Sequence, residues 1–223
     1  NDVIFVVAGT NDRRGTKNEL KIGSPADSVN ALVVNSVNTL DNPTTYSRKG
    51  PVLSFYIKPD VSYYGGDTTS FEECINTIGV GNTEDLVSGT SYAAPWIARK
   101  LAYLIHIIGF SKEEAKALII DSAEKWGNKY SEEEIELFGH GVVPIDINEI
   151  IKTPKNEIRF VISGFAEMYE TYNLTLPVPT HKDKYPFIAK ATMCYFSTCN
   201  RAQGVDYTNE ELENHELIVK TVS

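Results

Sequence analysis

The chain has 223 residues, 42% of them hydrophobic, which is enough to bury the core of one large domain or one and a half ordinary ones. Its net charge of −9, without a basic run, argues against nucleic acid or an anionic membrane as the main partner. No apolar run reaches the length of a membrane span, and no targeting signal is recognisable. Cys74, Cys194 and Cys199 lack metal-ligand spacing and are odd in number, which favours a reduced, cytoplasmic protein over a disulfide scaffold.

The first 40 residues predict a parallel sheet. Residues 2–8 form a continuous apolar run, which is typical of a strand buried on both faces. A turn-prone cluster at 9–12 ends this run, and a proline-containing turn at 23–29 leads to a second apolar run at 31–37. This order of elements predicts α/β architecture. Residues 67–84 are polar and show no periodicity, so we expect a loop there.

A long helix is predicted from Ser91 to about Ile108. Apolar residues recur along it at spacings of three and four, so one face belongs in the core. Ser91 stands where a glycine-containing loop meets this helix, and free N–H groups there favour negative charge that develops during acyl transfer. The plainer alternative for Ser91 is a helix cap. Ser111 and Ser131 each begin a Ser-x-x-Glu capping box, which predicts two further helices.

The pattern changes after residue 155. Four stretches rich in β-branched and aromatic residues are separated by proline and polar turns, which predicts strands. These stretches are residues 157–165, 172–178, 187–195 and 216–220. We therefore expect residues 1–150 to form an α/β unit with a parallel sheet and flanking helices. Residues 155–223 are expected to form a small antiparallel, β-sandwich-like module.

Several motifs resemble the subtilisin-like serine proteases. Around Ser91 the chain reads Gly-Thr-Ser-Tyr-Ala-Ala-Pro, similar to the Gly-Thr-Ser-x-Ala-x-Pro string around that family's nucleophile. Before Asn11 a strand ends in Ala-Gly-Thr, where the family has Ala-Ala-Gly. Lys-Pro-Asp-Val at 58–61 and Phe-Gly-His-Gly-Val at 138–142 are similar to two further segments of that domain. The resemblance covers roughly residues 2–145 and implies the C-terminal portion of a subtilisin-like peptidase domain.

The resemblance implies roles for four residues. Ser91 is expected to be the nucleophile, and Asn11 an amide donor to the oxyanion, an interaction commonly worth about 3 kcal/mol of barrier. Asp12 and Gly23 are expected in the walls and floor of the pocket for the residue before the cleaved bond, where an acid favours basic side chains. The plainer alternatives are an asparagine in a turn position for Asn11 and an ordinary loop acid for Asp12.

A serine of this kind needs a histidine base and an acid to orient it. The family carries them in His-Gly-Thr and Asp-Ser/Thr-Gly motifs before its asparagine; this chain has neither motif, and its four histidines all follow Ser91. We therefore expect part of a longer serine endopeptidase acting on protein or peptide substrates. Its N-terminal half, with the aspartate and histidine, is missing here, so this fragment alone is expected to be inactive. Asp60 is interpreted as a structural acid.

Two other functions remain open. A noncatalytic, subtilase-like binding or scaffold protein would keep the serine without ever having had a triad. A lipase or esterase would normally place its serine in Gly-x-Ser-x-Gly, whereas Ala93 stands two residues after Ser91. No metal cluster or cofactor motif is visible in the sequence, although a calcium site built from carbonyl oxygens leaves little trace in a sequence.

Overall fold

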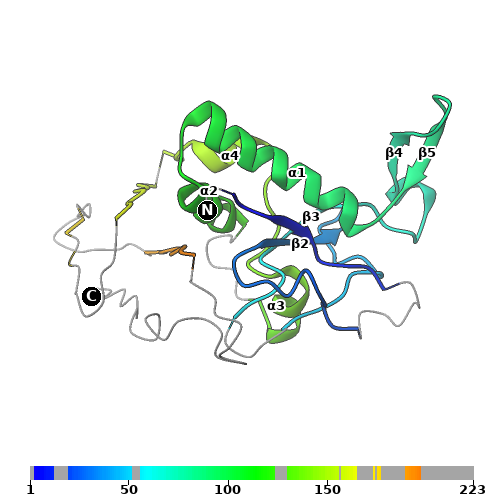
Figure 1. Ribbon diagram of the computed structural model, residues 1–223, viewed down its shortest axis with the longest axis horizontal. Coiled ribbons are helices and arrows are strands. Elements are labelled where there is room, and N and C mark those ends of the chain that lie inside the picture. The colour runs from blue at the N-terminus through cyan, green and yellow to red at the C-terminus, as the bar shows by residue number, and fades with distance from the viewer. Residues whose placement is uncertain are drawn as a thin grey trace. The chain divides into compact units, whose positions relative to one another are not determined.

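The structure is a computed structural model that describes residues 3–12, 20–51, 56–123, 130–155, 157–164, 173, 175–176 and 189–196. The chain separates into two units, Asn1–Ile158 and Arg159–Ser223. All helices and strands of the described residues lie in the first unit (Figure 1).

Three parallel strands form the centre of the first unit, in the spatial order β1-β2-β3 (Figure 1). Their bounds are Val6–Ala8 for β1, Leu32–Val37 for β2 and Val61–Tyr64 for β3. All six residues of β2 are buried, as expected for a central strand covered on both faces. The second predicted strand is therefore confirmed.

β1 is shorter and more exposed than its apolar sequence predicts. Its three residues are half-buried, and Phe5, just before it, is 68% exposed. β1 pairs with β2 on one side, and no other described strand lies on its second side. The prediction of a strand buried on both faces is therefore wrong for β1, because it forms an edge of the described sheet.

The long helix α1 packs against this sheet (Figure 1). It spans Thr90–Tyr103 and continues as a π-helical turn, Leu104–Ile108, which ends at Gly109. The helix predicted from the apolar spacing is confirmed. Its buried residues share the main core with β2, β3 and the next helix; they are Ala93, Ala94, Ile97, Leu101 and Leu104.

Three shorter helices follow α1 in the part of this unit that the structure describes. They are α2 (Lys112–Ala123), α3 (Glu132–Phe138) and α4 (Ile147–Ile151). Both predicted capping boxes are present. The Glu114 N–H donates to Ser111 Oγ at 3.1 Å while the Ser111 N–H donates to the Glu114 carboxylate at 2.7 Å. At α3 the corresponding distances between Ser131 and Glu134 are 3.3 and 2.8 Å.

A two-stranded antiparallel sheet leads into α1. Strands β4 (Ile75–Ile78) and β5 (Glu84–Val87) pair after a short 3-10 turn at Phe71–Glu73. The loop expected over residues 67–84 is therefore wrong. Gly81, at φ 79°, supplies the left-handed conformation that the reversal between the strands requires. The fold thus contains both a parallel sheet with flanking helices and a small antiparallel sheet.

The β-rich module predicted for residues 155–223 stays a prediction. Residues 157–164 and 189–196 form no strand within the described ranges, and most of the remaining module lies outside them. Among the helices that the structure describes, none is long and apolar enough to cross a membrane.

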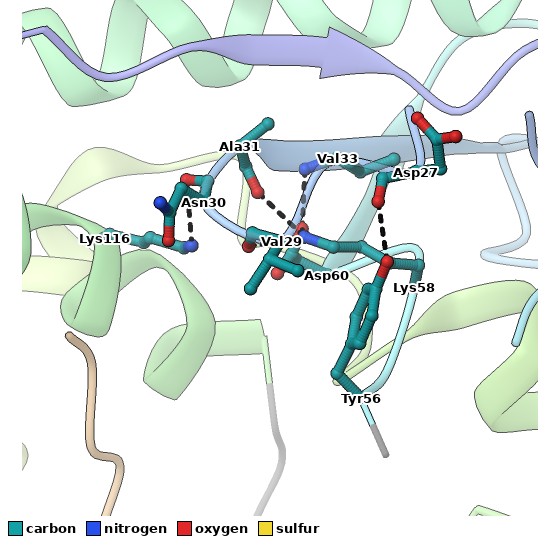
Figure 2. Close-up of polar contacts among 9 residues, drawn as sticks. All are labelled: Asp27, Val29, Asn30, Ala31, Val33, Tyr56, Lys58, Asp60 and Lys116. Carbon is teal, nitrogen blue, oxygen red and sulfur yellow. Dashed lines mark hydrogen bonds and ion pairs between the residues drawn. The ribbon is translucent and has the colours of Figure 1, made fainter. Parts of the chain in front are cut away.

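A buried ion pair ties the start of β3 to the segment before β2 (Figure 2). Lys58 Nζ lies 2.6 Å from Asp60 Oδ2, and Lys58 is only 2% exposed. The ammonium also donates to Ala31 O at 2.8 Å, and the carboxylate accepts the Val33 N–H at 2.7 Å. These contacts agree with the interpretation of Asp60 as a structural acid.

Candidate active site

Ser91 is the second residue of α1, and its side chain is exposed. The residue before the helix, Gly89, has φ 153°, a conformation that residues with a side chain rarely adopt. A Cβ at Gly89 would also lie 3.1 Å from Asn11 Nδ2. The turn before Ser91 therefore needs glycine both for its backbone and for its close approach to Asn11.

The first amide groups of α1 are paired except at Ser91. The Gly89 N–H donates to Gly65 O at 2.9 Å, and the Tyr92 N–H donates to Gly89 O at 2.9 Å. The Thr90 N–H donates to Asn11 Oδ1 at 3.1 Å. Among the described residues, no partner is found for the N–H or the hydroxyl of Ser91. An unpaired N–H at a helix N-terminus favours an anionic oxygen.

Asn11 follows β1 in a turn with an unusual backbone. Thr10 has φ 72°, a left-handed conformation that β-branched residues rarely adopt. Asn11 Oδ1 accepts both the Thr90 N–H and the Thr90 hydroxyl, the latter at 2.9 Å. Because both Thr90 donors bond to one atom of this side-chain amide, that atom is the oxygen. The remaining atom is then the nitrogen, Nδ2, which is a donor.

Ser91 and Asn11 line the same pocket, which has a volume of about 360 Å³. The other lining residues are Val7, Ala8, Thr10, Pro25 and Thr90. The pocket thus lies where the end of β1, the start of α1 and the turn around Pro25 meet. No charged side chain belongs to this lining in the part of the chain that the structure describes.

Asp12 and Gly23 lie in the segments that form this pocket but not in its described lining. Asp12 is 4% exposed, and its N–H donates to Tyr46 O at 2.6 Å. Pro25, two residues after Gly23, reaches the pocket instead. The substrate-binding roles of Asp12 and Gly23 stay predictions. Sequence reasoning missed Pro25, which lies in the proline-containing turn at 23–29, and Thr90, which belongs to the motif around Ser91.

The two described histidines, His106 and His140, lie away from Ser91. His106 is in the π-helical turn, about 22 Å along the helix axis at 1.5 Å per residue. The His140 N–H donates to Asp60 O at the amino end of β3, whereas Asn11 follows the carboxyl end of the parallel strand β1. His181 and His215 lie outside the described residues. Within the described ranges, no group of three or more potential metal ligands is found.

The sequence profile of the subtilase family matches residues 1–141. The chain belongs to the subtilase family. It is 36% identical over 122 residues to subtilisin-like protease 2 of Pseudogymnoascus destructans, and 34% identical over 122 residues to subtilisin-like protease 1 of the same organism. Each match covers 55% of this chain and 27% of the relative, so the chain spans only about a quarter of these curated subtilases.

Solved structures of subtilases share the fold. The epidermin leader peptide processing serine protease of Staphylococcus aureus matches with a TM-score of 0.53 and 20% identity over 70% of this chain and 42% of that protein. A protease of Pseudoalteromonas arctica matches with a TM-score of 0.51 and 17% identity over 67% of this chain and 42% of that protein. At such identities the likeness bears on the fold alone, and it confirms the predicted subtilisin-like α/β domain.

Proposed function

We propose that this chain supplies the nucleophile and the oxyanion donors of a subtilisin-like serine endopeptidase that hydrolyses protein or peptide substrates. The observation that carries the proposal is the shared pocket of Ser91 and Asn11, two residues from distant parts of the chain. Membership of the subtilase family and similarity to two subtilisin-like proteases support it.

In this proposal Ser91 Oγ attacks the carbonyl carbon of the scissile peptide bond and gives its proton to a histidine. Asn11 Nδ2 and the Ser91 N–H donate to the carbonyl oxygen as it becomes an oxyanion. The C–N bond then breaks, and the amine leaves with the proton that the histidine held. Water hydrolyses the acyl-enzyme by the same steps. Asp12 and Gly23 border the site of the residue before the cleaved bond.

The histidine and the aspartate come, in this proposal, from a polypeptide outside the described residues, which is the missing N-terminal half. Large apolar side chains are exposed on the elements that form the pocket: Tyr92 and Trp96 follow Ser91 on α1 and are 39% and 46% exposed. Phe5, beside β1, is 68% exposed. These groups offer apolar area that a covering polypeptide would bury. The chain alone is therefore expected to be inactive.

Fluorophosphonate labelling tests this proposal. The chain alone should label no faster than its Ser91→Ala variant, because no base activates the hydroxyl. Combined with a polypeptide that carries the aspartate and histidine motifs, it should label rapidly and cleave peptides. Ser91→Ala should then abolish labelling and lower kcat on the order of a millionfold. Ser88→Ala, in the same loop, is the matched control and should retain both activities.

Three results would contradict the proposal in whole or in part. Labelling that persists in Ser91→Ala would place the nucleophile elsewhere. A complete protein that neither labels nor cleaves peptides would favour the noncatalytic binding or scaffold protein. Rapid labelling of the chain alone, lost in Ser91→Ala, would leave the nucleophile in place but would overturn the expected inactivity, since the base would then lie within these 223 residues.

A further inference from the structure

One short segment behind the pocket, residues 46–48, runs alongside the turn that carries Asn11. Asn11 and Ser47 form an antiparallel bridge. On either side of this bridge, the Asp12 N–H donates to Tyr46 O at 2.6 Å and the Arg48 N–H lies 3.4 Å from Thr10 O. The backbone of the Asn11 turn is therefore fixed by this segment and not by the pocket residues alone.

The Arg48 side chain adds a second set of contacts to the same turn. Its Nε donates to Asn11 O at 3.3 Å, and its Nη1 donates to Lys21 O at 3.4 Å. A Cβ on Gly23 would lie 4.0 Å from Nη1, so the guanidinium lies near that residue. Because the donors of a guanidinium have fixed directions, one side chain sets the spacing between the Asn11 turn and residues 21–23.

Arg48 is itself anchored to the central strand. Asn35 of β2 is fully buried, and its Nδ2 donates to Arg48 O at 2.8 Å and to Leu137 O at 2.9 Å. The amide oxygen of Asn35 points toward Gly9, where a Cβ would come within 2.2 Å of it. The base of the Arg48 side chain is thus held by the most buried strand of the sheet.

The other end of the segment is linked through Gly65 to the turn before Ser91. The Tyr46 hydroxyl lies 2.5 Å from Gly66 O and 3.1 Å from Gly65 O, and Gly65 O also accepts the Gly89 N–H at 2.9 Å. Burial raises the pKa of Tyr46, so its hydroxyl keeps the proton that it donates. Residues 46–48 therefore contact the Asn11 turn directly and the turn before Ser91 through Gly65.

We propose that Arg48 is a positioning residue for Asn11. Its guanidinium holds the Asn11 backbone so that Oδ1 meets Thr90 and Nδ2 faces the pocket. Arg48 is not part of the described pocket lining, and its Nε donates to Asn11 O, so in this proposal it acts through Asn11. The kinetic consequence rests on the proposed function, whereas the structural consequence does not.

Hydrogen exchange of the Thr90 amide, followed by NMR on the 223-residue chain, tests the structural consequence. This N–H donates to Asn11 Oδ1, so it exchanges faster when Asn11 leaves its place. Arg48→Met should speed its exchange about tenfold, the equivalent of one lost hydrogen-bond contribution. Arg48→Lys should have an intermediate effect, because one ammonium cannot span both carbonyls. In Asn11→Ala, which removes the acceptor, Arg48→Met should add nothing.

A control variant and a second reporter amide make this result specific. Arg159→Met removes a guanidinium outside the family-matched residues and should leave Thr90 exchange unchanged. The Asp60 N–H, bonded to Val33 O at 2.9 Å, reports on the sheet and should not change in Arg48→Met. Unchanged Thr90 exchange in Arg48→Met overturns the proposal. Equal acceleration at Thr90 and Asp60 also overturns it, because Arg48 would then only support overall stability.

The complete enzyme tests the kinetic consequence. Arg48→Met should lower kcat roughly tenfold with little change in KM, because the oxyanion donor acts on the transition state. This loss should disappear in the Asn11→Ala background, whereas equal losses in both backgrounds would show that Arg48 does not act through Asn11. If no Ser91-dependent hydrolysis is found at all, the proposed function fails, and the exchange experiment still decides the role of Arg48.

Discussion

The Lys58–Asp60 pair and the Ser91–Asn11 pair are both polar, but the ammonium of the first has a hydrogen-bond partner for each donor, whereas the Ser91 hydroxyl of the second has none among the described residues. The Lys58 ammonium, 2% exposed, has three donors and lies within 3.4 Å of three acceptors: Val29 O, Ala31 O and Asp60 Oδ2. The Ser91 hydroxyl is exposed and has no partner among the described residues. Polar groups that are buried and satisfied fix the fold, whereas unsatisfied groups at the end of a helix stay available for a substrate.

The buried pair is also connected to one wall of the pocket through the backbone. Three side chains donate to the carbonyl groups of residues 27–31 (Figure 2): the Lys58 ammonium, the Tyr56 hydroxyl at 2.6 Å from Asp27 O, and the Lys116 ammonium at 3.3 Å from Asn30 O. The chain just before this segment carries Pro25, which lines the pocket. The hydrogen bonds of Lys58, Tyr56 and Lys116 therefore hold a backbone segment that continues into the wall of the Ser91–Asn11 pocket.

The largest effect on this comparison should come from Lys58→Met. It leaves the buried Asp60 carboxylate without its cation, which should lower the free energy of unfolding by about 3–5 kcal/mol. Urea denaturation measures this loss. The double variant Lys58→Met/Asp60→Asn, which removes both charges and keeps an acceptor for the Val33 N–H, should recover much of it. A loss no greater than that of the exposed Lys152→Met would show that the pair does not hold the fold.

Asn11→Asp should separate folding from catalysis at the pocket. The aspartate keeps an oxygen for the Thr90 N–H and hydroxyl but loses the Nδ2 donor and adds a negative charge near the oxyanion. In the complete enzyme kcat should fall roughly 10²- to 10³-fold, with the unfolding midpoint nearly unchanged. Steady-state kinetics and thermal unfolding measure the two quantities. A wild-type kcat would remove Asn11 from the proposed mechanism.

Gly9→Ala tests the packing between the start of the Asn11 turn and the central strand β2. The added Cβ would come within 2.2 Å of the Asn35 amide oxygen, so it should cost about 1–3 kcal/mol of unfolding free energy, as overpacking typically does. In an Asn35→Ala background the same change should cost less, because the clashing amide is gone. Urea denaturation of the four proteins gives the coupling. Equal costs in both backgrounds would mean that Asn35 does not occupy the space beside Gly9.

The smallest effect is expected at the surface cap of α3. Hydrogen bonds from the Ser131 N–H and hydroxyl lower the pKa of Glu134 below its ordinary value of 4.5. A carboxyl with a lowered folded-state pKa stabilises the fold above its unfolded pKa and loses this contribution as the pH falls through the folded pKa. The stability difference between wild type and Glu134→Gln should therefore shrink in acid. Urea denaturation across this range, with Glu133→Gln as control, checks the trend.

Much of the α/β unit could be predicted because its signals are local. The apolar spacing after Ser91 predicts α1, the two Ser-x-x-Glu boxes mark the starts of α2 and α3, and the apolar run at 31–37 marks β2. Ser91 and Asn11 could be singled out because each stands in a short motif. That they share one pocket is a long-range fact that the sequence alone implies only through the resemblance.

The features that sequence reasoning missed depend on tertiary context. The β4-β5 hairpin exposes Ile78 and Val80, by 76% and 98%, so its strands show no buried stripe, although the Gly79-Val80-Gly81-Asn82 turn was a signal for it. The burial of β1 was overestimated because an apolar sequence does not tell an edge strand from a central one. The contacts of Arg48 join residues distant in sequence and belong to no motif.

The position of Trp96, one turn beyond Ser91, gives the molecule its own optical probe. The indole is 46% exposed, with the Arg99 guanidinium 5.5 Å from its ring centre. The chain has only one other tryptophan, Trp126, so Trp126→Phe would leave Trp96 as the sole indole emitter. Docking of a complementary polypeptide over α1 should then shift the fluorescence to shorter wavelengths, so that assembly can be titrated without any turnover of substrate.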